Sequence, residues 1–116
     1  MATNAEHQKA WRQRNPEENR RRNRTNYQMR KERNRAYLRS FLLEHPCEGC
    51  GERDPSVLEF DHLDRQAKLK TVSDMALSAS IAKLMAEVAK CRVLCANCHR
   101  RHTAKQMRWH GLQGSL

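Results

Sequence analysis

Hydrophobic positions recur with a helical period near residue 40, after a long stretch in which polar residues dominate. The stripe is formed by Tyr37, Leu38, Phe41 and Leu42. Upstream, Asn15 is suited to cap a helix, Pro16 fits the first helical position, and Glu18 has the spacing of a capping box. His45-Pro46 should end the helix, because a residue before proline is pushed out of helical backbone angles. The pattern therefore predicts one helix over residues 16–44, with its second half packed on a core and its first half projecting.

Two short segments further along are expected to pair as strands. Residues 57–62 alternate between apolar and polar side chains, which places Leu58 and Phe60 on the face toward the core. Val93 and Leu94 suit a second strand that pairs with the first.

The remaining patterns predict three short helices and a tail. Thr71 to Ser73 can cap the first of them, and the last should run from about residue 98 to residue 107. The middle helix covers residues 80–90 and turns one apolar face to the core: Ile81, Leu84, Met85 and Val88. Two glycines mark a fraying tail over residues 109–116.

Only 38% of the residues are hydrophobic and 5% aromatic, so the core should be thin and need a staple, either disulfides or a metal. The five cysteines fit the metal better, because the odd one would leave a free thiol in a disulfide framework. Four of the five cysteines form two Cys-x-x-Cys pairs: Cys47, Cys50, Cys95 and Cys98. Four thiolates suit the closed tetrahedral site of a structural zinc ion, and glycines at 49 and 51 permit the positive φ of such a turn. Cys91 is expected to be a small buried apolar residue.

The polar N-terminus resembles no secretory signal, and no apolar run approaches the ~20 residues that span a bilayer. A reducing cytoplasm is therefore the expected location, and paired cysteines usually bind metal there.

The net charge of +10 is concentrated in residues 1–45, which we call the basic arm. This segment has 12 Lys and Arg against 5 Asp and Glu, a net charge of +7. Such an excess indicates a polyanionic partner, nucleic acid before anionic membrane, because the arm lacks an apolar face. The expected phosphate contacts in the arm are Arg20, Arg21, Arg22, Arg24, Arg30 and Lys31. The alternative is a solvated arm that becomes helical only on binding.

Asp61 and His62 end the first predicted strand, beside the predicted zinc site. Adjacent strand residues point to opposite faces, so both can serve one site only if the strand ends or bends at His62. On the last predicted helix, His99 can turn toward Asp61 and hold a second ion with it. His102 follows one turn later, either within reach of a phosphate or as a plain surface histidine.

Three segments together resemble the HNH endonuclease family, in its zinc-bound form common in phages and bacteria. They are Cys-x-x-Cys-Gly at residue 47, Leu-Glu-Phe-Asp-His at residue 58, and Leu-Cys-Ala-Asn-Cys-His-Arg-Arg-His-Thr at residue 94. The match covers roughly residues 46–104. It implies an α+β fold, in which a small zinc-stapled ββα-metal (HNH) domain over residues 46–108 follows the basic arm.

The resemblance also implies roles for individual residues. Asp61 and His99 would bind a catalytic Mg²⁺ or Mn²⁺, and His62 would be the general base. The middle Asn of the family precedes the second strand, where this chain has Lys90. Asn97 lies inside the second cysteine turn instead, so it either steadies the loop that carries His62 or only forms the turn.

Phosphodiester cleavage needs an activated water, charge neutralisation at phosphorus and help for the leaving oxygen. Histidine titrates near neutral pH and suits the first task, while a hard cation suits the others. Basic residues on the last helix are candidate phosphate contacts: Arg100, Arg101 and Lys105.

The expected function is therefore a DNA endonuclease that nicks, or cuts both strands as a homodimer. The alternatives are a non-catalytic zinc module that regulates by binding nucleic acid, and an accessory to phage packaging proteins. The resemblance places any of these in a bacterial or phage-infected host cell, with no membrane partner.

Overall fold

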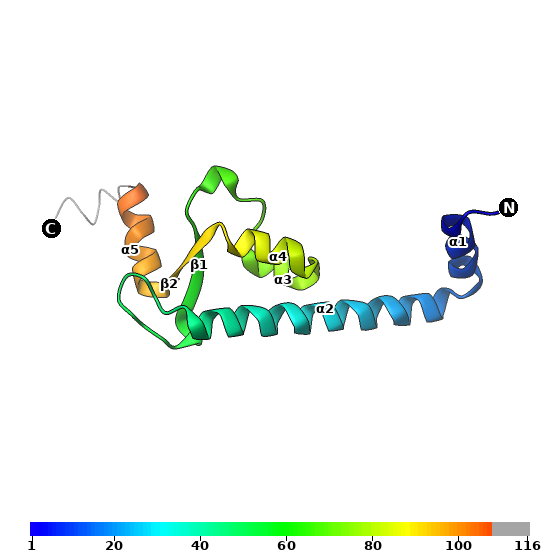
Figure 1. Cartoon of the computed structure of the whole chain (residues 1–116), viewed down its shortest axis with the longest axis horizontal. Helices are drawn as coiled ribbons and strands as arrows, with labels where there is room; N and C mark the ends of the chain where they lie inside the picture. Colours follow the sequence, from blue (N-terminus) through cyan, green and yellow to red (C-terminus); the bar gives the residue numbers. More distant parts are fainter. Residues whose placement is uncertain (108–116) are drawn as a thin grey trace.

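The computed structural model describes residues 1–107, so the tail expected over residues 109–116 lies outside the described part. Within residues 1–107, five α-helices accompany one two-stranded antiparallel sheet, which confirms an α+β arrangement. The molecule is elongated, with extents of 72 × 28 × 22 Å, because one long helix runs along most of its length (Figure 1).

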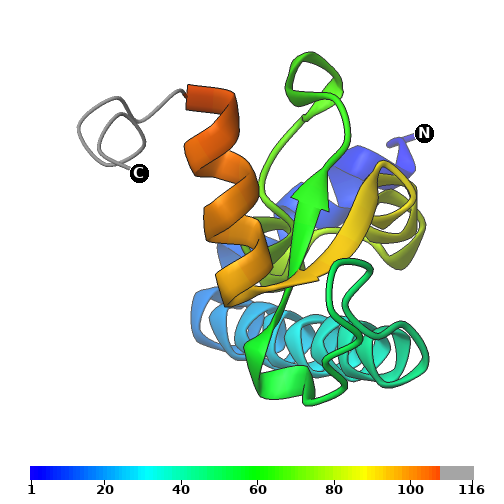
Figure 2. The ribbon, with the colours of Figure 1, turned by 90° about the vertical axis from the view of Figure 1, so that its left-hand side faces the viewer.

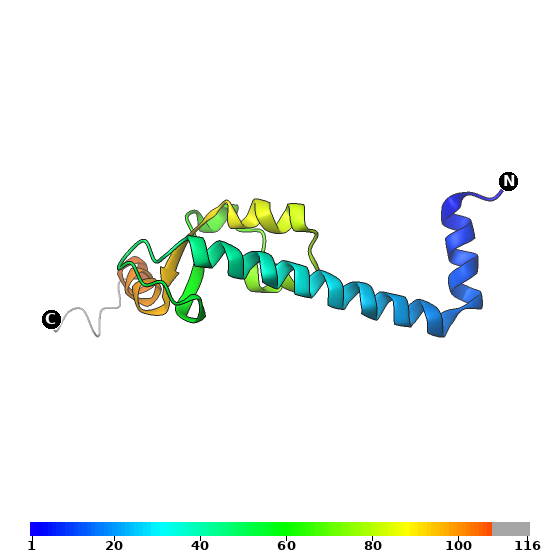
Figure 3. The same cartoon turned by 60° about the horizontal axis from the view of Figure 1, so that its bottom comes forward.

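That helix is α2 (Pro16–Glu44), and its predicted start and end are confirmed. It is preceded by α1 (Asn4–Arg14), which the sequence patterns above do not predict. Thr3 and Glu6 form a reciprocal capping box that begins α1. Figure 3 shows α1 turning away from the far end of α2.

The bend between the two helices is at Asn15. Its side chain donates a hydrogen bond to the Trp11 carbonyl (2.9 Å) and makes none to the first turn of α2. Asn15 therefore occupies the predicted N-cap position, but its side chain does not make the predicted capping bond, because it is hydrogen-bonded to the helix that ends there. The Arg22 guanidinium lies 4.8 Å from the centre of the Trp11 ring, a cation–π contact across the bend.

The second half of α2 packs on the rest of the chain, as its apolar stripe predicts. Phe41 contacts both core clusters, while Tyr37 and Leu38 contact one and Leu42 the other. Packing begins at Asn34, which is fully buried although it is polar. Its amide donates to the carbonyls of Ala76 (3.2 Å) and Ala79 (2.9 Å), so it caps the end of a neighbouring helix.

The sheet pairs β1 (Leu58–His62) with β2 (Cys91–Cys95) in antiparallel register, which confirms the predicted pairing. Leu58 lies opposite Cys95 and His62 opposite Cys91. Helix α5 (Ala96–Met107) follows β2 directly and begins two residues before its predicted start. It packs against the sheet (Figure 2).

Along the sequence, two short helices separate the strands: α3 (Val72–Ser78) and α4 (Ile81–Val88). Both pack alongside α2. Thr71 caps α3 as expected, since its hydroxyl accepts from the Asp74 N–H. Leu84 and Val88 are buried, but Met85 is 48% exposed, so its predicted place in the core is wrong. The buried face of α4 extends instead to Glu87, and Met85 is about 200° around the helix from it.

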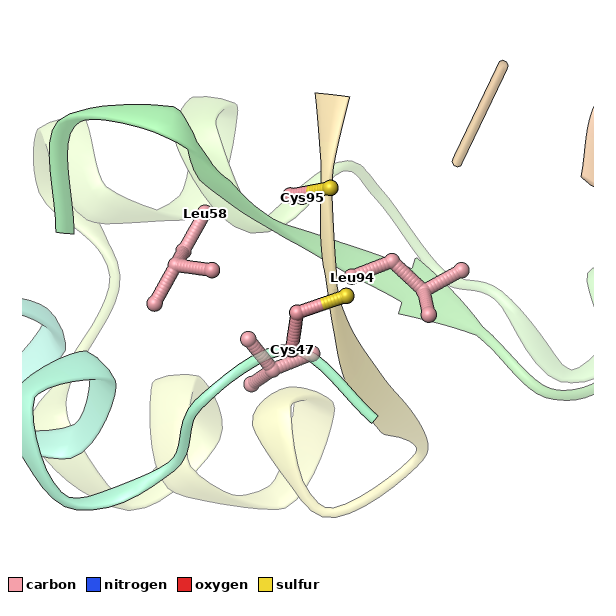
Figure 4. Close-up of a cluster of buried hydrophobic side chains, with 5 residues drawn as sticks. Cys47, Leu58, Leu94 and Cys95 are labelled. Atoms are coloured by element: carbon pink, nitrogen blue, oxygen red, sulfur yellow. The ribbon is translucent and has the colours of Figure 1, made fainter. Parts of the chain in front are cut away.

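Two small clusters make up the buried core of the described residues. One joins the first cysteine turn to the sheet: Cys47, Leu58, Val93, Leu94 and Cys95 (Figure 4). The other consists of side chains from α3 and α4 that pack against α2: Val72, Met75, Leu84 and Val88. No helix within residues 1–107 has the length and apolar character to cross a membrane.

Candidate metal centre and catalytic site

The four paired cysteines converge at one end of the sheet. Their sulfur atoms all lie within 4.8 Å of one another, and those of Cys50 and Cys95 are 3.7 Å apart. Bonds of about 2.3 Å to a tetrahedral zinc ion would separate sulfur atoms by about 3.8 Å. The cluster therefore has the donor atoms and the size for a metal ion such as zinc. It joins the loop of Cys47 and Cys50 to the junction of β2 and α5, which lies 45 residues further along the sequence.

Backbone geometry explains why these turns bring the sulfurs together. The N–H of Gly49 donates to Cys47 Sγ (3.3 Å), and that of Cys98 donates to Cys95 Sγ (3.4 Å). A Cβ atom on Gly49 would lie 2.9 Å from Cys98 Sγ, so any larger residue would push against the cluster. Of the two glycines expected to permit a positive φ in this turn, Gly51 has one (81°) and Gly49 does not.

The thiols differ in their affinity for protons. Burial alone would raise the pKa of Cys47, but hydrogen bonds with Cys95, Cys50 and Gly49 outweigh it and lower the pKa to about 6. Hydrogen bonds to the sulfurs of Cys95 and Cys47 raise the pKa of Cys98 to about 12. One thiolate is thus favoured while its neighbours share their protons with it. A cation in the cluster would replace those protons.

A second group of polar residues lines a cavity of about 430 Å³ at the end of β1. Asp61 and His62 come from the strand, and His99 comes from α5. Because β1 ends at His62, the strand end that a shared site requires is confirmed. Arg65 and Lys68, from the loop that follows, also line the cavity.

His99 is held between two carboxylates. Its Nδ1 lies 2.7 Å from Glu59 Oε2, and its Nε2 lies 3.3 Å from Asp61 Oδ1. Two ligand atoms at right angles on an ion with bonds of about 2.1 Å would be about 3 Å apart. Asp61 Oδ1 and His99 Nε2 therefore fit as neighbouring ligands of a divalent cation. The other Asp61 oxygen accepts from Arg92 Nε (3.0 Å).

His62 contacts a buried carboxylate on α4. Its Nε2 lies 2.8 Å from Glu87 Oε1, and the two side chains are only 8% and 2% exposed. The N–H of Leu69 donates to the same oxygen (3.0 Å). Lys90 Nζ donates to Glu87 Oε2 (2.9 Å) and to the Ala67 carbonyl (2.9 Å). Chiefly the Lys90 bond, opposed by burial, lowers the pKa of Glu87 to about 2, so this carboxylate is ionised.

Two of the predicted site residues lie outside this cavity. His102 is half-buried on α5, one turn beyond His99, and does not line it. Asn97 is exposed, and no hydrogen bond joins its side chain to the loop after His62 within residues 1–107. Lys90 makes a connection to that loop, because its Nζ donates to the Ala67 carbonyl.

The basic residues expected to contact nucleic acid are on the surface. All are exposed except Lys31, which is partly covered: Arg20, Arg21, Arg22, Arg24, Arg30, Lys31, Arg100, Arg101 and Lys105. Within residues 1–107, no salt bridge neutralises any of them.

Four residues at the site were not predicted: Glu59, Arg65, Lys68 and Glu87. The alternation of β1 does place Glu59 opposite the core face, where α5 packs. Glu87 lies three residues after Leu84, at a spacing that shares its face.

Comparisons with protein-family models, with curated proteins and with solved structures find no match for this chain. Its function has to be inferred from the chemistry and geometry of the two sites.

Proposed function

We propose that this protein is a divalent-metal-dependent DNA endonuclease of the HNH type. The observation that carries the proposal is that Asp61, His62 and His99 line one cavity, with a potential ligand pair 3.3 Å apart. The four-cysteine cluster supports it, because zinc there would fix β2 and α5 and hold His99 beside the end of β1. In this proposal β1, β2 and α5 form the ββα-metal unit.

Each residue then has a task in phosphodiester hydrolysis. His62 takes a proton from the attacking water, since it is the cavity's histidine not engaged with Asp61. Asp61 and His99 would hold Mg²⁺ or Mn²⁺, which supplies charge neutralisation at the scissile phosphate and its leaving oxygen. Arg65 and Lys68 line the same cavity and contact the flanking phosphates.

The basic arm brings DNA to this site. The arginines on the first half of α2 are exposed, and no salt bridge within residues 1–107 neutralises them. This half of the helix extends away from the core (Figure 1). Each phosphate that they neutralise releases counterions, so binding should weaken steeply with salt.

A non-catalytic regulator that binds nucleic acid is the second candidate. The projecting basic helix favours it, because such an arm needs no active site. It leaves Asp61, His62 and His99 in one cavity without a purpose.

Supercoiled plasmid separates the two candidates. Zinc-loaded protein is incubated without divalent cation, with Mg²⁺, with Mn²⁺, and with EDTA added after Mn²⁺. Zinc content and circular dichroism are followed in parallel, so that loss of activity in EDTA is not confused with loss of the structural metal. We expect nicked or linear plasmid with Mg²⁺ or Mn²⁺ only. Retarded but uncut plasmid in every condition would support the regulator instead.

A further inference from the structure

Glu87 is a buried anion whose bonds reach three parts of the candidate catalytic site. It is 1% exposed and lies on α4, whereas His62 ends β1 and Leu69 belongs to the following loop. Burying a carboxylate is costly unless it is paired and hydrogen-bonded. The Lys90 ammonium neutralises the charge of Glu87, and the Leu69 N–H donates a hydrogen bond to its Oε1. In addition, Glu87 Oε1 lies 2.8 Å from His62 Nε2.

The arrangement determines which nitrogen of His62 is available. Glu87 is ionised, as its pKa of about 2 indicates, and can only accept hydrogen bonds. A neutral His62 must therefore keep its proton on Nε2 to make this bond, which leaves Nδ1 as the unprotonated nitrogen. Lys90 holds the other carboxylate oxygen and the Ala67 carbonyl, so Glu87 and the loop are fixed together.

We propose that Glu87 is the positioning residue of His62: it fixes the Nε2–H tautomer and directs Nδ1 to the attacking water. The catalytic part of this inference rests on the proposed endonuclease function. Glu87 touches no reacting atom and acts only through the imidazole. Removing it would leave His62 free to adopt either tautomer and to rotate.

The tautomer is measurable without turnover. The ¹⁵N shifts of the two His62 ring nitrogens are recorded at alkaline pH on zinc-loaded protein. The wild type is expected to show a protonated Nε2 and a bare Nδ1, whereas Glu87→Ala should show averaged shifts. Protonated Nδ1 in the wild type would overturn the proposal. This measurement does not depend on whether the variant folds. Glu44→Ala, at an exposed glutamate on α2, is the matched control.

Cleavage kinetics provide a second test. Glu87→Ala should lower kcat about 10- to 100-fold, the range seen when an outer carboxylate partner of a functional histidine is removed. The KM for DNA should change little, because Glu87 is buried away from the substrate. A purely structural role predicts lower stability with unchanged kcat per folded molecule, and that result would overturn the proposal. If wild-type protein cuts no DNA, the proposed function fails while the ¹⁵N shifts still decide the tautomer.

A second cavity, of about 490 Å³, lies between α2 and the turn that joins α3 to α4. Four cationic side chains from three segments line it, against a single carboxylate: Arg30, Arg33, Lys70 and Lys83, with Asp74. None of them forms a salt bridge within the described residues. Arg33 is held in place by Asn34 Oδ1 (3.1 Å) and the Ala79 carbonyl (3.3 Å).

We infer that this cavity binds a backbone phosphate of nucleic acid, where the projecting half of α2 meets the core. Uncompensated cations converging from separate segments favour an anion, and a preorganised guanidinium suits phosphate. Arg30 is among the residues that line this cavity, and none of the residues of the catalytic cavity lines it.

Binding of a short labelled duplex, measured by fluorescence anisotropy over a salt series without divalent cation, tests this site. Lys70→Glu/Lys83→Glu should weaken binding and reduce the salt slope by about 2, roughly 0.9 for each lost contact. Arg39→Glu/Arg53→Glu changes the net charge equally at exposed positions elsewhere. Equal effects of the two double variants would overturn the assignment.

Discussion

Nε2 of His99 lies 3.3 Å from Oδ1 of Asp61, although the two residues are on different elements. The carboxylate of Glu59 lies 2.7 Å from Nδ1 of the same ring. A carboxylate on the far nitrogen of a metal-binding histidine fixes both its orientation and its tautomer.

Glu59→Gln should therefore weaken binding of the catalytic cation. We expect about 10- to 100-fold more Mn²⁺ to be needed for half-maximal plasmid cleavage. Glu44→Gln is a suitable control, since Glu44 is exposed at the end of α2. An unchanged Mn²⁺ requirement would show that Glu59 does not orient His99.

Loss of one paired cysteine should abolish both zinc binding and the fold. Cys50→Ser removes a sulfur that lies 3.7 Å from Cys95 Sγ, and a structural zinc contributes on the order of 10 kcal/mol. Metal analysis should find one zinc per wild-type chain and none in the variant, whose circular dichroism should show unfolding. Cys91→Ser keeps the zinc under this account, since burial raises the pKa of Cys91 to about 11 and it lies outside the cluster.

Glu87 should make the protein sensitive to acid. Its folded-state pKa of about 2 is below its ordinary value of 4.5, so the unfolded chain takes up the proton first. The ionised Glu87 therefore adds roughly 3 kcal/mol to the free energy of unfolding. This contribution is complete above pH 4.5 and is lost as the pH falls toward about 2. Urea unfolding at successive pH values should show this slope in the wild type and a weaker one in Glu87→Gln. Asp54, whose pKa is lowered by hydrogen bonds from Ser56, affects both proteins equally.

The contact between α2 and α3 should depend on Asn34. Asn34→Ala leaves the carbonyls of Ala76 and Ala79 without their donor, at a cost of about 1–3 kcal/mol in the free energy of unfolding. Asn23→Ala, at an exposed position of the same helix, should be neutral or slightly stabilising because alanine is the better helix former. Similar urea midpoints for the two variants would contradict this account of Asn34.

The sequence predicts elements well where local signals agree. Pro16 and His45-Pro46 define α2, and alternation with turn residues defines β1. Helix α1 also has a local signal, the Thr3 and Glu6 capping box, but its segment is largely polar and has no apolar periodicity to predict a helix.

The polar contacts of the site were harder to predict from the sequence, because they depend on tertiary structure. Glu87 would be solvated on an isolated helix, and only the return of β1 and the loop to Leu69 gives it partners. Glu59 gains His99 from a helix 40 residues away. Arg65 and Lys68 lie in an irregular segment with no periodicity to place them.

The most direct test of the central claim compares plasmid cleavage by wild-type protein and His62→Ala with Mn²⁺. Both must contain equal zinc and bind DNA equally, and His7→Ala, at an exposed histidine of α1, is the control. We predict that the wild type and His7→Ala convert supercoiled plasmid to nicked or linear product. The rate for His62→Ala should fall by about 10²- to 10⁴-fold, as expected for loss of a general base. Cleavage by His62→Ala at the wild-type rate would contradict the assignment of this residue as the catalytic base.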